Sequence, residues 1–221
     1  MRRRYARHGA DIFDSHQLME MLLFHSIRRG DTNGLAHKVL NTCTEGGLTR
    51  AMSSALLQVD GIGEKTATLL SLSSDVTVRL LQDSLKNEPF KTDFSLRLYT
   101  WLCFASCREK AVFALLLDDR KRLLDKVCIA RGKAARPESY LESVLQAAPS
   151  LEGASKNCRY VVLAHNHRSG ATVPSVEDVY LTELFSEGLS NSGMSLLASF
   201  VVTDTDCIRC DTTINDEQEI K

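Results

Sequence analysis

The chain lacks any long apolar segment. Its longest apolar runs, such as residues 111–117, are far shorter than the ~20 residues that a membrane-spanning helix needs. The arginines near its start are followed by residues 9–14, which contain two aspartates, and not by the apolar stretch of a secretory signal. We therefore expect a cytoplasmic protein that makes no contact with a membrane.

An excess of charge and a regular cysteine pattern are also lacking. The net charge is -1, so nothing in the overall charge predicts binding to nucleic acid, and such binding would need a local patch. Seven irregularly spaced cysteines argue against a disulfide framework. With 43% hydrophobic and 25% charged residues among 221, the composition is that of a globular protein with one large domain or two small ones.

The distribution of apolar residues predicts two domains of different texture. Residues 1–85 carry apolar side chains at helical spacing and are expected to form an all-helical domain. A polar segment with Pro89 predicts a linker over residues 86–98. Beyond it, residues 99–221 alternate compact apolar runs, typical of buried strands, with helical patterns that start near Pro137 and Ser175. The overall prediction is an α+β protein.

The most informative segment is residues 165–178, which reads His-Asn-His-Arg-Ser-Gly-Ala-Thr-Val-Pro-Ser-Val-Glu-Asp. His165 and His167, two residues apart at the end of an expected strand, point to the same face. Asp178 follows in the first turn of an expected helix. Two imidazoles and one carboxylate leave the fourth tetrahedral position of Zn²⁺ open, as in catalytic zinc sites.

The same residues have a structural interpretation. Ser175 and Asp178 have the spacing of a helix-capping pair, and two histidines in a turn can simply be exposed polar residues. From the spacing alone, a metal site and an ordinary cap both remain open.

The pattern of His165, His167, Ser175 and Asp178 resembles the JAMM signature of JAB1/MPN-type metallopeptidases, and His-Asn-His-x-Ser-Gly is similar to the RadC family. Segments 9–23, 31–33, 46–48 and 60–63 also resemble the N-terminal part of RadC proteins. The resemblance implies a helix-hairpin-helix-like domain (1–85) followed by a JAB1/MPN-like domain (99–221) with a mixed sheet and flanking helices.

The resemblance also implies a function. It makes His165, His167 and Asp178 the ligands of Zn²⁺, and gives Ser175 the role of orienting bound water. The expected activity is hydrolysis of a peptide or isopeptide bond in a peptide or protein substrate. A link to DNA repair is implied as well.

One position departs from this family pattern. The family has an upstream Glu as general acid/base, but Lys110 occupies that position here and Glu109 lies one residue away. On a strand, a shift of one residue turns a side chain to the opposite face, although a bulge can re-aim it. Glu109 is the candidate base. Because losing a general base costs ~10²–10⁴ in rate, a catalytically weak or inactive metal-binding protein is the alternative.

Two weaker motifs complete the predictions. Gly61 and Gly63 resemble the hairpin of helix-hairpin-helix domains, and with Lys65 they predict weak contact with DNA phosphates. The same turn can serve only to pack two helices. Cys207 and Cys210 have the spacing of half a zinc site, but without a second pair we interpret them as ordinary thiols in or after a terminal strand.

Overall fold

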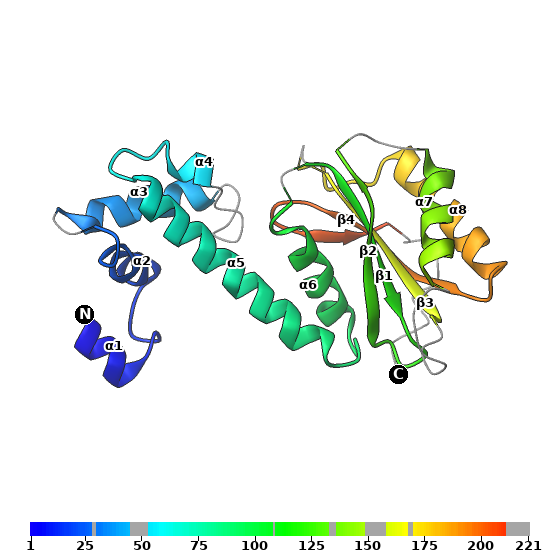
Figure 1. Cartoon of the computed structure of the whole chain (residues 1–221), viewed down its shortest axis with the longest axis horizontal. Coiled ribbons are helices and arrows are strands. Elements are labelled where there is room, and N and C mark those ends of the chain that lie inside the picture. Colours follow the sequence, from blue (N-terminus) through cyan, green and yellow to red (C-terminus); the bar gives the residue numbers. More distant parts are fainter. Residues whose placement is uncertain are drawn as a thin grey trace. The chain divides into compact units, whose positions relative to one another are not determined.

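The computed structural model describes residues 1–27, 30–44, 53–107, 109–132, 136–148, 158–167 and 170–210 (Figure 1). The chain divides into two compact units, Met1–Arg79 and Leu80–Lys221. Each unit is described by itself. Among the described helices, none has the length and apolar character needed to span a membrane.

Every regular element described in the first unit is a helix. The helices are α1 (Arg2–His8), α2 (Ser15–Leu23), α3 (Thr32–Thr44), α4 (Ser53–Leu56) and α5 (Glu64–Lys86), the last of which continues past the unit boundary. Their shared core is built mainly from aliphatic side chains: Met19, Leu23, Ala36, Val39, Leu56, Val59, Ile62, Ala67 and Leu70. The sequence periodicity anticipated most of these helices; α1 was missed.

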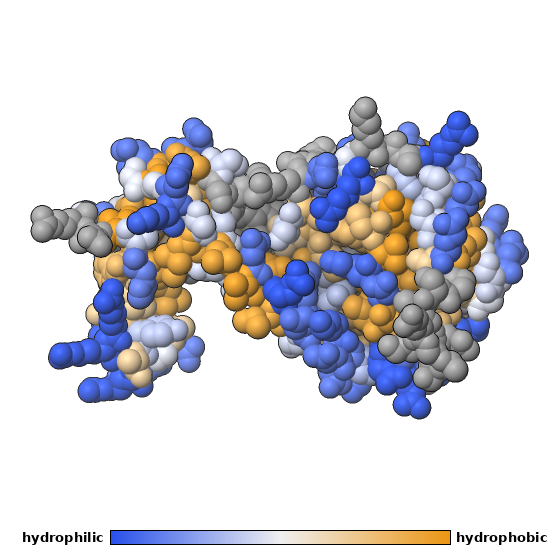
Figure 2. Space-filling model, viewed as in Figure 1, coloured by the Kyte–Doolittle hydropathy of each residue, from blue (hydrophilic) through white to orange (hydrophobic). Residues whose placement is uncertain are grey.

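Helix α5 carries apolar side chains on two sides. One side contributes Ala67 and Leu70 to the core, whereas Leu72, Val76 and Leu80 are 57%, 49% and 64% exposed. Figure 2 shows apolar surface along this helix. The exposed side of α5 is therefore partly apolar, whereas an ordinary amphipathic surface helix has a polar exposed face.

The second unit is a mixed sheet with helices on both faces, as predicted. It comprises α6 (Asp93–Phe104), β1 (Ala111–Leu117), β2 (Leu123–Arg131), α7 (Pro137–Ala147), β3 (Tyr160–Asn166), α8 (Val176–Ser190), β4 (Ser195–Val202) and β5 (Cys207–Arg209). The strand order is β2-β1-β3-β4-β5. Only the β3–β4 pair among these described strands is parallel.

Alternation along the strands separates two layers of core. In β1, Phe113 and Leu115 pack in the cluster that contains α6, whereas Ala114 and Leu116 pack with side chains of α7 and α8. Figure 1 accordingly places α6 on one side of the sheet and α7 and α8 on the other. His165 lies on the side of the sheet that faces α7 and α8.

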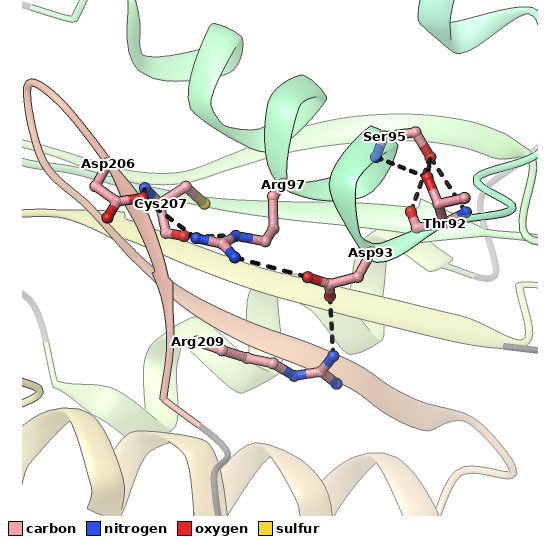
Figure 3. A network of polar contacts seen from close by, with 7 residues as sticks. All are labelled: Thr92, Asp93, Ser95, Arg97, Asp206, Cys207 and Arg209. Atoms are coloured by element: carbon pink, nitrogen blue, oxygen red, sulfur yellow. Dashed lines mark hydrogen bonds and ion pairs between the residues drawn. The ribbon is translucent and has the colours of Figure 1, made fainter. Parts of the chain in front are cut away.

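Helix α6 occupies part of the segment that the sequence predicted as a linker. Residues 93–98 form its first half, since Thr92 caps it by accepting a hydrogen bond from the Ser95 N–H at 3.1 Å. Figure 3 shows how this end of α6 is tied to the terminal hairpin. Arg97 Nε donates to the Cys207 carbonyl at 2.8 Å, and Arg209 Nη1 donates to Asp93 Oδ1 at 3.1 Å. Contacts between residues about a hundred positions apart therefore support α6, whose first half the polar sequence led us to predict as a linker.

Candidate metal centre

The two histidines lie at the end of β3, a central strand. Val161 and Leu163 of β3 face α7 and α8, so alternation places His165 on the same side. The His167 N–H donates to the Val202 carbonyl at 2.9 Å, which extends the pairing with β4 one residue beyond Asn166. His165 and His167 therefore point to the same face, as the sequence predicted from their spacing.

Asp178 reaches this face from the first turn of α8. Ser175 is the N-cap: its Oγ accepts from the Asp178 N–H at 3.2 Å, and the Ser175 N–H donates to Asp178 Oδ2 at 2.6 Å. Thr182 Oγ1 lies 2.8 Å from the Asp178 carbonyl and 2.9 Å from Ser199 Oγ on β4. The cap fixes the carboxylate and the buried hydroxyl pair anchors the first turn of α8 to the sheet.

The three side chains converge on one point. Asp178 Oδ1 lies 2.7 Å from His165 Nε2, and Asp178 Oδ2 lies 3.2 Å from His167 Nε2. The two Nε2 atoms are 3.2 Å apart. Ligand atoms held ~2.0–2.1 Å from a tetrahedral ion are about 3.3 Å from one another, so this donor set fits a metal with little movement. Within the described part of the chain, these three residues are the group that could hold an ion.

A backbone carbonyl contacts the far nitrogen of the His167 ring. Its Nδ1 lies 3.2 Å from the Ala171 carbonyl, which can only accept a hydrogen bond, so this contact favours the tautomer that leaves Nε2 available to a metal. Such a contact orients a metal-binding imidazole and strengthens it as a ligand. His165 Nδ1 is buried and has no hydrogen-bond partner among the described residues.

Electrostatics keep Asp178 in the form that binds a cation. Burial by itself would raise its pKa, but the contact with His165 and the hydrogen bonds with Ser175 hold the pKa well below the usual carboxyl value. The carboxylate is therefore ionised at neutral pH, as a metal ligand must be. Asp178 therefore caps α8, as the structural interpretation predicted, and also faces the histidines in a group that could hold a metal.

The predicted catalytic residues occupy different places. Ser175 stands at the rim of the centre as the cap of α8. Glu109 directs its carboxylate towards Gly132, which directly follows β2 and where an added Cβ would meet Glu109 Oε2 at 3.0 Å. Glu109 is described but is not part of the three-residue group, and its role as a base stays a prediction.

Asn166 is a residue that the sequence did not single out. Its side chain is 5% exposed and lies between two backbone groups that flank Lys110. Oδ1 accepts from the Ala111 N–H at 2.7 Å, and Nδ2 donates to the Glu109 carbonyl at 3.0 Å. The sequence could have indicated Asn166, because it is a polar residue at a buried strand position between two candidate ligands.

The remaining predicted positions are not members of the three-residue group. In the first unit, Gly61 has a φ of 95° just before α5 and Lys65 is exposed. Cys207 in β5 and Cys210 after it are buried and form no disulfide within the described part of the chain. Burial raises the pKa of Cys207 to about 12, which disfavours thiolate chemistry there.

Comparison with known proteins agrees with this geometry. Residues 93–212 match the model of the RadC-like JAB domain. The UPF0758 protein of Fusobacterium nucleatum is 24% identical, covering 92% of this chain and 89% of its own. The UPF0758 proteins of Dechloromonas aromatica and Polaromonas sp. are 29% and 33% identical, covering 91% and 73% of this chain and 88% and 70% of theirs. The chain therefore belongs to the RadC-like JAB domain family.

Proposed function

We propose that this protein is a zinc-dependent hydrolase that cleaves a peptide or isopeptide bond. The observation that carries the proposal is the convergence of two imidazole nitrogens and one ionised carboxylate at 2.7–3.2 Å. Nitrogen and oxygen donors in this number suit zinc and leave one position open. The bound ion would supply a polarised carbonyl and hydroxide at neutral pH.

The residues of the chain would divide the remaining tasks. The Ala171 carbonyl favours the binding tautomer of His167. The Ser175 hydroxyl accepts from the Asp178 N–H and would donate its own hydrogen to an oxyanion that develops beside the centre. Asp178 and the histidines orient the site but do not act as a free base. With Lys110 at the family's base position, we expect slow turnover.

Metal content tests the proposal most directly. The wild-type protein should bind close to one zinc per chain, whereas His165→Ala should lose most of it because one of three ligands is gone. His25→Ala is the matched control, since His25 is an exposed histidine of α2's C-terminal turn. Equal zinc content in all three proteins would refute the site. Zinc binding without cleavage of any peptide or isopeptide library would favour the alternative, a metal-binding module without catalysis.

A DNA-associated accessory role is the second candidate. It is supported by the positive φ of Gly61 next to the N-terminus of α5, a geometry that can direct backbone N–H groups at a phosphate. Lys65 adds an exposed cation, while the carboxylate of Glu64 in the same turn opposes an anion.

A salt titration of DNA binding by the full chain distinguishes the possibilities. Binding through this hairpin should weaken steeply with salt, and Lys65→Ala should reduce the slope by about one contact. Lys86→Ala, at the opposite end of α5, is the control. Undetectable binding at low salt would remove the DNA-associated role.

A further inference from the structure

Lys110 belongs to the side of the sheet that carries the metal centre. Val112 of β1 lies opposite His165 in the antiparallel register, and it packs on the α7 and α8 side. The Gly132 N–H donates to the Lys110 carbonyl at 2.8 Å, so the pairing of the chain with β2 continues to residue 110. Two positions before Val112, Lys110 therefore shares its face.

Asn166 holds Lys110 in this orientation. Its buried amide bonds the Glu109 carbonyl on one side of Lys110 and the Ala111 N–H on the other. The Asn166 amide thus takes the place of a backbone partner for residues 109–111, which lie beside the end of β3. Asn166 lies between His165 and His167 in the sequence. The segment that carries the two imidazoles therefore also holds position 110.

Lys110 adds positive charge to the face that carries the centre. A divalent ion and the Asp178 carboxylate would leave one positive charge, and the ammonium group of exposed Lys110 adds another on the same face of the sheet. No ion pair of Lys110 is found within the described residues. The adjacent carboxylate of Glu109 is turned towards Gly132, which directly follows β2. A site with this excess favours an anionic ligand.

We propose that Lys110 is a specificity-determining residue that pairs with a carboxylate of the molecule bound at the metal. The inference rests on the proposed function and deepens it: substrates are peptides with a carboxylate next to the bond that is cleaved. That carboxylate belongs either to a free C-terminus or to an acidic side chain, and both present the same group to an ammonium ion.

Binding of short peptides to the zinc-loaded full chain tests the inference by calorimetry. The probes are acetyl-Ala-Ala with a free C-terminus, its C-terminal amide, and acetyl-Asp-Ala-amide, with zinc content measured in every sample. Wild type should bind at least one carboxylate probe about tenfold more tightly than the neutral amide, as expected for one partly exposed charge pair. The better carboxylate probe identifies the source of the anion.

Variants separate Lys110 from general charge effects. Lys110→Met should remove the preference for the carboxylate without loss of zinc, and Lys110→Arg should retain it. Lys126→Met is the matched control, because Lys126 is exposed on the same sheet but lies over the Phe113 ring, on the opposite face. Zinc binding with a preference that is absent, or that survives Lys110→Met, would overturn this inference and leave the proposed function intact. Absence of zinc in wild type would overturn both.

Discussion

Asp178 has two separable tasks, and substitutions can divide them. Its Oδ2 accepts the Ser175 N–H at 2.6 Å as part of the α8 cap, and both of its oxygens face the histidines. Asp178→Asn keeps an oxygen that can accept from Ser175 but removes the anionic ligand. Ser175→Ala removes the hydroxyl of the cap but leaves the ligand set intact. The two variants should therefore fail in opposite ways.

The expected magnitudes follow from these contacts. Loss of a helix N-cap costs about 1 kcal/mol of unfolding free energy, so metal-free Ser175→Ala should be less stable by that amount. Zinc at a thousand times its Kd stabilises the native state by about 4 kcal/mol. If replacing the carboxylate weakens zinc binding a hundredfold, about 2.7 kcal/mol of that gain disappears in Asp178→Asn. Asp178→Ala should lose both contributions.

Urea unfolding with and without zinc measures both effects. The chain has a single tryptophan, and Trp101 lies on α6, so its fluorescence reports on the unit that contains the centre. Ser175→Ala should keep the zinc-induced increase in stability, and Asp178→Asn should lose most of it. If Asp178→Asn retained the full increase, Asp178 would be only a cap and the reasoning about the metal centre would be wrong.

Two further predictions concern β1. Burial of Asp118 would raise its pKa, but hydrogen bonds from Arg122 and Arg120 lower the pKa in the folded state. The contribution of Asp118 to the free energy of unfolding is therefore complete above the ordinary carboxyl pKa of ~3.9. This contribution is lost as the pH falls through the lower pKa of the folded state. Asp118→Asn should cost about 1–2 kcal/mol at neutral pH and flatten the acid limb of a stability–pH curve, whereas exposed Asp119→Asn should change neither. Lys110→Glu should tighten zinc and raise cleavage of peptides that carry no carboxylate next to the bond at least about tenfold, by removing a cation and adding a base on the metal face. If Glu109→Gln abolished cleavage while Lys110→Glu had no effect, a bulge would have turned Glu109 inward.

Local patterns determined much of the fold and the candidate ligands. Apolar runs of strand length predicted β1, β2 and β3. The reason is clearest for β1 and β3, because a strand buried on both faces needs apolar side chains at nearly every position. The prediction that His165 and His167 point to the same face required only that the strand continue to His167, since side chains two residues apart on a strand share a face. Helix signals near Ser175 located α8 to within one residue. These features depend on neighbours within a few residues.

Tertiary structure decided what local patterns left open. Helix α6 is supported by contacts of Arg97 with the β5 region, and no local pattern contains those partners. Whether Asp178 is a cap or a ligand depends on the distance between α8 and the end of β3, which the sheet and the Thr182–Ser199 contact set. The face occupied by Lys110 depends on cross-strand register and on the Asn166 amide. Spacing limits which residues can share a face, but packing between distant segments determines which of them meet.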